Sequence, residues 1–135
     1  MTAPSGKSKA VILEVDDDHD IRELVSRVLK ADGYEVATAS DGTQVLAIIA
    51  TSKPDLVLLD MKMPGKSGSE VLKEIRLAHT KLPVILATGV ADMEAASVAL
   101  ANGANGYLLK PFQRSELLRS IAETLASAAS KTSRP

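Results

Sequence analysis

The chain has 135 residues, a length that fits one domain able to bury its own core. It contains no cysteine, which excludes disulfides and thiolate metal ligands. The formal net charge is −1 and the basic residues are spread along the chain, so nothing supports binding to nucleic acid. No segment has the apolar length of a membrane span or the pattern of a secretory signal, and we expect a cytoplasmic protein without a membrane partner.

Five short segments of branched aliphatic residues alternate with segments whose apolar residues recur at helical spacing. The predicted strands are 10–15, 34–38, 56–59, 82–87 and 106–109. The predicted helices run from about 21 to 32, from 43 to 52 and from 92 to 101. Another follows Gly68-Ser69-Glu70 and carries Val71, Leu72 and Ile75, and the last carries apolar residues from Leu117 to Leu125. Residues 1–8 and 128–135 are polar or small, so we expect a disordered arm and a disordered tail around one domain at 9–127.

The alternation of strands and helices indicates the α/β class. Each predicted strand is almost continuously apolar, which is typical of a parallel sheet covered by helices on both faces. Right-handed crossovers then produce a doubly wound sheet. No sequence repeat is visible beyond this alternation.

Polar side chains follow four of the five strands. Asp16 and Asp17 come after the first strand, Asp60 after the third, Thr88 after the fourth and Lys110 after the fifth. Because parallel strands end at the same edge of the sheet, we expect these side chains to meet in one crevice, where ligands bind in open α/β sheets.

Three neighbouring carboxylates repel one another unless a cation lies among them. Carboxylate oxygens with room for water suit Mg²⁺, and Mn²⁺ can substitute for it. Lys110 and the Thr88 hydroxyl can donate to a phosphoryl group held beside Asp60. The chemistry that follows is attack of the Asp60 carboxylate on phosphorus, which gives an acyl phosphate.

Four motifs carry a family resemblance: VILEVDDD at 11–18, PDLVLLDMKMPGKSG at 54–68, LPVILATG at 82–89 and GANGYLLKPF at 103–112. Together they closely resemble the receiver domain of two-component response regulators over residues 9–127. The resemblance implies a (βα)5 three-layer sandwich with a flavodoxin-like parallel sheet of order 2-1-3-4-5. It also implies a cis peptide bond before Pro111.

The resemblance further implies a role for each strand-end residue. Asp60 corresponds to the phosphoacceptor, Thr88 to the switch hydroxyl, Tyr107 to the switch aromatic and Lys110 to the phosphate-contacting lysine. The acidic pair Asp16 and Asp17 belongs to the metal site, in which Asp17, Asp60 and the backbone carbonyl of Lys62 bind Mg²⁺ directly.

A receiver of this kind is a signalling switch in a phosphorelay and not an enzyme. The phosphoryl group comes from a histidine kinase or a histidine phosphotransfer protein. Thr88 then moves toward it, Tyr107 turns inward, and the surface formed by 92–122 changes its affinity for a downstream protein. We expect a monomer or a weak homodimer without an output domain, acting alone or as part of a longer protein such as a hybrid kinase.

Individual residues also have simpler interpretations. Asp60 alone could be a turn residue, Thr88 a β-branched strand residue, Lys110 a surface charge and Tyr107 plain core packing. Asp18 and Asp20 are interpreted as solvated or helix-capping residues and not as ligands.

Three other functions compete with the receiver. A dehalogenase-like phosphatase requires a second aspartate where Lys62 stands. A nucleotide or flavin binder requires a loop after the first strand rich in glycine, serine or threonine, whereas this loop is acidic. A degenerate receiver only binds a partner and never accepts a phosphoryl group.

Three residues depart from the pattern of the family. Glu14 lies within the first strand, on the same face as Asp16, and a buried carboxylate there needs a partner or a proton. Lys62 and Val90 lie two residues beyond Asp60 and Thr88, at positions that, in the family that the chain resembles, influence how fast the acyl phosphate hydrolyses.

Overall fold

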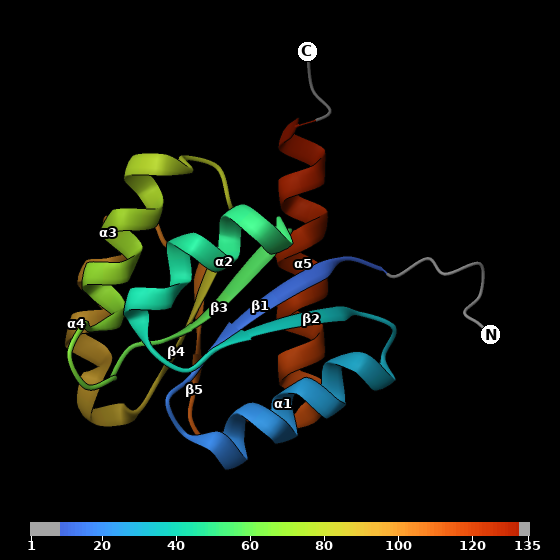
Figure 1. Ribbon diagram of the computed structural model, residues 1–135, viewed down its shortest axis with the longest axis horizontal. Coiled ribbons are helices and arrows are strands. Elements are labelled where there is room, and N and C mark those ends of the chain that lie inside the picture. Colours follow the sequence, from blue (N-terminus) through green and yellow to red (C-terminus); the bar gives the residue numbers. More distant parts are fainter. Residues whose placement is uncertain (1–8, 133–135) are drawn as a thin grey trace.

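A computed structural model describes residues 9–132 of the protein. Within this range five parallel strands form one sheet in the order β2-β1-β3-β4-β5 (Figure 1). The strands are β1 (Val11–Val15), β2 (Glu35–Ala39), β3 (Leu56–Asp60), β4 (Val84–Thr88) and β5 (Gly106–Leu109). The predicted doubly wound, flavodoxin-like sheet and its strand order are therefore confirmed.

Helices cover both faces of this sheet (Figure 1). One face is covered by α1 (His19–Ala31) and α5 (Arg114–Thr132). The other is covered by α2 (Val45–Ser52), α3 (Gly68–Ala78) and α4 (Met93–Ala101), and short 3₁₀ turns, η2 (Gly42–Gln44) and η3 (Val90–Asp92), precede α2 and α4. Within residues 9–132, no helix combines the length and the apolar character needed to cross a bilayer.

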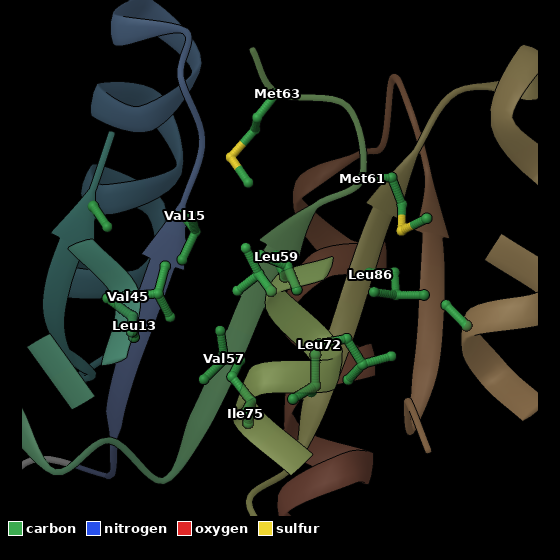
Figure 2. Packing of buried hydrophobic residues seen from close by; sticks show 14 of the residues in the cluster. Leu13, Val15, Val45, Val57, Leu59, Met61, Met63, Leu72, Ile75 and Leu86 are labelled. Atoms are coloured by element: carbon green, nitrogen blue, oxygen red, sulfur yellow. The ribbon is translucent and has the colours of Figure 1, made fainter. Parts of the chain in front are cut away.

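The core consists of two clusters separated by the sheet, because side chains alternate between its faces. Leu13 and Val15 pack toward α2 and α3, whereas Ile12 packs toward α1 and α5. Every residue of β3 and β4 is buried, as expected for central parallel strands. Figure 2 shows the first cluster, to which α4 contributes only the small buried side chains of Ala96 and Ala99.

Helix starts follow local capping chemistry. Asp18 is the N-cap of α1, and its carboxylate accepts hydrogen bonds from the backbone N–H groups of Asp20 and Ile21. Ser67 and Glu70 form a reciprocal capping box at the start of α3. The interpretation of Asp18 as a capping residue is therefore confirmed.

The C-terminal boundary differs from the prediction. The expected tail from 128 is helical up to Thr132, because α5 continues through a segment of alanine, serine and lysine that contains no glycine or proline. Alanine favours the helix even without an apolar face to bury. The predicted arm at 1–8 and the last residues of the predicted tail, 133–135, lie outside the described residues.

The first residue of α3 packs directly against the end of β3. A Cβ atom added to Gly68 would lie 2.6 Å from the carbonyl oxygen of Asp60 and 2.7 Å from the Cα of Met61. Both contacts are with backbone, which cannot move aside as a side chain can. Glycine is therefore required at this position by the close approach of two chain segments.

We predict that Gly68→Ala lowers the free energy of unfolding by about 2 kcal/mol, because the added methyl group overpacks the contact. Urea denaturation measures this. Gly106→Ala is the matched control, since an added Cβ there meets nothing within 4 Å. Equal stability losses in the two variants would contradict the prediction.

Candidate functional site

The carboxyl ends of the strands bring together the polar residues singled out from the sequence. Asp60 is the last residue of β3 and pairs with Ala87 of β4, one residue before Thr88. Thr88 in turn pairs with Leu109, and Lys110 follows it directly. The Lys110 backbone N–H donates to the Thr88 carbonyl oxygen at 2.7 Å, which ties the two loops together. The peptide bond between Lys110 and Pro111 is cis, as expected.

Three carboxylates lie at the centre of this edge. Asp16, Asp17 and Asp60 each offer an oxygen, and these oxygens lie within 4.8 Å of one another. Asp16 and Asp60 are each only 4% exposed, whereas Asp17 is exposed. An all-oxygen set that is open on one side fits a hard divalent cation that keeps some of its water, such as Mg²⁺.

Lys110 compensates part of the negative charge. Its Nζ lies 3.0 Å from Oδ1 of Asp60 and 3.5 Å from Oδ2 of Asp16. Burial raises the pKa of Asp60 above its ordinary value, although the hydrogen bond and charge of Lys110 oppose this shift. Burial lowers the pKa of Lys110, but the two carboxylates outweigh burial and leave this pKa above its ordinary value. Lys110 is therefore an ammonium group held against the carboxylates and not a free surface charge.

The loop after β3 is anchored on both sides of Lys62. Met61 and Met63 are buried, and Figure 2 shows both side chains entering the cluster that contains Leu59. The Lys62 side chain is exposed, while its backbone N–H lies 3.3 Å from Oδ1 of Asp60. Two buried neighbours thus hold the backbone of Lys62 beside the carboxylates, where its carbonyl group is expected to bind the metal.

Thr88 and Tyr107 lie on neighbouring strands but in different environments. Thr88 is buried, and its hydroxyl donates to the Gly89 carbonyl oxygen at 3.2 Å. Tyr107 is 44% exposed, so the interpretation of this residue as plain core packing is wrong for this structure. The hydroxyl of Thr88 is therefore available inside the site, and the aromatic ring of Tyr107 is directed away from the core.

Glu14 is buried below the carboxylates. It is 1% exposed, and its Oε1 has no hydrogen-bond partner among the described residues. Burial raises the pKa of Glu14 to about 8, and the charge of Asp16 adds to this shift, while Arg22 and Lys110 oppose it. Of the two alternatives expected for a buried carboxyl group here, a partner or a proton, the raised pKa and the unpaired Oε1 favour the proton.

Arg22 is a residue of the site that the sequence did not single out. It lies in the first turns of α1, and its Nη1 donates to the carbonyl oxygen of Asp16 at 2.7 Å. The sequence feature that could have indicated this contact is the position of Arg22, six residues after a strand-end aspartate and near the start of the following helix. The long side chain of an arginine at this position can reach the loop that precedes the helix, and in the structure Arg22 does so.

The comparison with known families agrees with this geometry. The sequence profile described as response regulator receiver domain matches residues 12–122. The chain belongs to the response regulator receiver domain family. Membership of this family accounts for both the strand order of the receiver domain and the polar residues at its strand ends.

Relatives of the receiver domain include complete regulators. The DNA-binding response regulator MtrA of Mycobacterium tuberculosis is 37% identical over 114 residues, which are 84% of this chain and 50% of MtrA. Regulatory protein AtoC of Escherichia coli is 42% identical over 106 residues, which are 78% of this chain and 23% of AtoC. The chain therefore spans about half the length of MtrA and less of AtoC.

Solved structures support the same assignment. The receiver domain of NtrX from Brucella abortus superimposes with a TM-score of 0.82 at 38% identity, covering 85% of this chain and 98% of that domain. A CheY-like receiver domain protein from Methanospirillum hungatei gives a TM-score of 0.85 at 33% identity, covering 90% of this chain and 97% of that protein. The match extends over nearly the whole of both solved domains.

We predict that Glu14 makes the stability of the receiver domain depend on pH. The pKa of Glu14 rises from 4.5 to about 8 on folding, so its favourable contribution is complete below pH 4.5 and is lost as pH rises to 8. The loss amounts to roughly 4 kcal/mol. Glu14→Gln removes this dependence, and urea denaturation at pH 5, 6.5 and 8 without divalent cations measures it.

The stability of Glu14→Gln relative to the unmutated protein should therefore increase steadily between pH 5 and 8. Glu23→Gln, at an exposed position of α1, is the matched control and should show a constant difference. Parallel pH profiles for Glu14→Gln and the unmutated protein would rule out a protonated Glu14.

Proposed function

We propose that this receiver domain accepts a phosphoryl group on Asp60 from a histidine kinase or a histidine phosphotransfer protein. The observation that carries the proposal is the surroundings of Asp60: it is buried at a strand end, its carboxylate lies among two others, and the Lys110 ammonium is 3.0 Å away. A structural turn residue needs neither the other carboxylates nor the lysine.

The chemistry is a transfer between two nucleophiles. A carboxylate oxygen of Asp60 forms a bond to phosphorus while the bond from phosphorus to the donor nitrogen breaks, and the histidine leaves with its electron pair. Asp16, Asp17, Asp60 and the Lys62 carbonyl would hold Mg²⁺, which neutralises phosphoryl oxygens when bound. Lys110 exchanges its contact with the Asp60 carboxylate for one with a phosphoryl oxygen.

The result is a switch and not an enzyme that turns over a substrate. A phosphoryl oxygen accepts a stronger hydrogen bond from Thr88 than the Gly89 carbonyl does, so the hydroxyl moves toward Asp60. The exposed ring of Tyr107 then turns into the space that Thr88 leaves. This changes the surface formed by 92–122, through which a downstream protein binds.

The competing functions explain less of the site. The phosphatase requires a carboxylate where Lys62 extends its side chain into solvent. The nucleotide binder requires backbone donors after β1, where Asp16, Asp17 and Asp18 would repel a phosphate. A degenerate receiver is the remaining alternative, and phosphorylation decides it.

The first test is chemical phosphorylation. We predict that incubation with a small phosphodonor and Mg²⁺ adds the mass of one phosphoryl group to the intact protein, and that Asp60→Asn abolishes this gain. Asp55→Asn is the matched control, since Asp55 precedes the same strand at its opposite end. A protein that gains no mass at Asp60, or a gain that persists in Asp60→Asn, would contradict the proposed function.

A second test concerns the lifetime of the acyl phosphate. Val90 is 73% exposed and has no polar atom with which to orient an attacking water. We predict that Val90→Glu shortens the lifetime on the order of tenfold, less than a fully positioned general base achieves because an exposed side chain is mobile. Decay of the phosphorylated mass over time measures the rate.

Val98→Glu is the control for Val90→Glu. Val98 is also an exposed valine, 57% accessible, but it lies within α4 and away from the strand ends. The lifetime should not change in this variant. An unchanged lifetime in Val90→Glu would show that the residue after Gly89 does not control hydrolysis.

A further inference from the structure

The acidic turn after β1 is held from three directions through Asp16. The Asp16 backbone N–H donates to Ala39 of β2 at 3.1 Å. Its side chain accepts from the backbone N–H of Asp18 at 2.9 Å and lies 3.5 Å from Lys110 Nζ. Its carbonyl oxygen accepts from Nη1 of Arg22 at 2.7 Å. Among these contacts, the one from Arg22 is made by α1, the helix that directly follows the turn.

The carbonyl of Asp16 matters because it belongs to the peptide group that leads into Asp17. A peptide group is planar, so fixing its carbonyl oxygen also fixes the direction in which the next residue leaves. Asp17 is exposed and has little packing of its own to orient it. The hydrogen bond from Arg22 therefore fixes the peptide group that ends at the Cα of Asp17, a residue whose carboxylate Arg22 does not touch.

We propose that Arg22 is a positioning residue for the divalent-cation site, which it serves by fixing the peptide group between Asp16 and Asp17. The inference rests on the proposed function, because it takes Asp17 as a ligand of the cation. Arg22 contacts no atom that binds the cation or the phosphoryl group in this assignment. Its effect on cation binding passes through the backbone of the acidic turn.

The positive charge of Arg22 makes the proposal easy to test, because charge and positioning act in opposite directions. A guanidinium group near the site repels a divalent cation, so removing it strengthens binding if charge alone matters. Removing it weakens binding if Arg22 holds the turn. Weaker binding after removal of the guanidinium group therefore cannot result from the loss of its charge.

The experiment measures Mg²⁺ affinity by calorimetry in the complete chain. Arg22→Met removes both the charge and the donor, and we expect about tenfold weaker binding, as for other residues that orient metal ligands. Arg22→Lys keeps a donor and should remain within about threefold of the unmutated protein, which is rescue by the conservative change. Arg27→Met, at an exposed arginine of the same helix, should leave the affinity unchanged.

A second readout separates positioning from a general loss of structure. The Mg²⁺ concentration that gives half-maximal phosphorylation should rise about tenfold in Arg22→Met, while the rate at saturating Mg²⁺ stays within about twofold of the unmutated protein. If Arg22→Met does not fold, as judged by urea denaturation, Arg22→Gln takes its place, since its amide can donate but carries no charge.

Unchanged or tighter Mg²⁺ binding in Arg22→Met would overturn the proposal, and so would a rate that stays low at saturating Mg²⁺. Absence of Mg²⁺ binding by the unmutated protein would overturn it too. The unmutated protein could also bind Mg²⁺ and yet gain no phosphoryl group at Asp60, which would contradict the proposed function. The Mg²⁺ affinities of the Arg22 variants would still decide whether Arg22 positions the cation site.

Discussion

Three carboxylates gathered at one edge of a sheet repel one another, and this repulsion is the constraint around which the site is built. Lys110 offsets part of it by direct contact with Asp60 and Asp16. Backbone N–H groups offset another part, since Asp18 and Lys62 each donate to a carboxylate. What remains is a local excess of negative charge, which favours a divalent cation over a purely structural network.

The same constraint accounts for the backbone around the site. Carboxylates that repel can be kept together only if the segments carrying them cannot separate. Asp60 ends a fully buried strand, and the next residues are fixed by Met61 and Met63 in the core and by the close contact with Gly68. These contacts hold the end of β3, and with it the Asp60 carboxylate, beside Asp16 and Asp17.

Most of the fold and the centre of the site could be predicted because both depend on local patterns. Continuous apolar segments identify the strands, and the rule that parallel strands end at one edge brings Asp60 and Lys110 together. Two features of the site depend on the three-dimensional structure and could not be predicted from the sequence. The raised pKa of Glu14 depends on its burial and on an Oε1 atom without a hydrogen-bond partner. The contact of Arg22 with Asp16 depends on the path of a long side chain over a loop.

The end of α5 and the environment of Tyr107 show a different limit. Residues 128–132 are helical in a segment of good helix formers that has no apolar periodicity, so the spacing of apolar residues does not indicate this part of α5. Tyr107 lies in a strand whose neighbours are apolar, and sequence spacing does not tell whether an aromatic ring at the edge of the sheet is inside or outside. Neither feature is specified by the spacing of apolar residues along the chain.

The small buried side chains of α4 set an energy scale for the proposed switch. Burying a leucine or valine contributes roughly 1.5 to 3 kcal/mol, and an alanine with its single methyl group contributes about 0.8 kcal/mol. The contacts of Ala96 and Ala99 with the core are therefore worth about as much as one charge-assisted hydrogen bond. In the proposed switch, a single new bond between Thr88 and a phosphoryl oxygen would be comparable in size with these two contacts, whereas it would not offset the loss of the leucine contacts of the central strands.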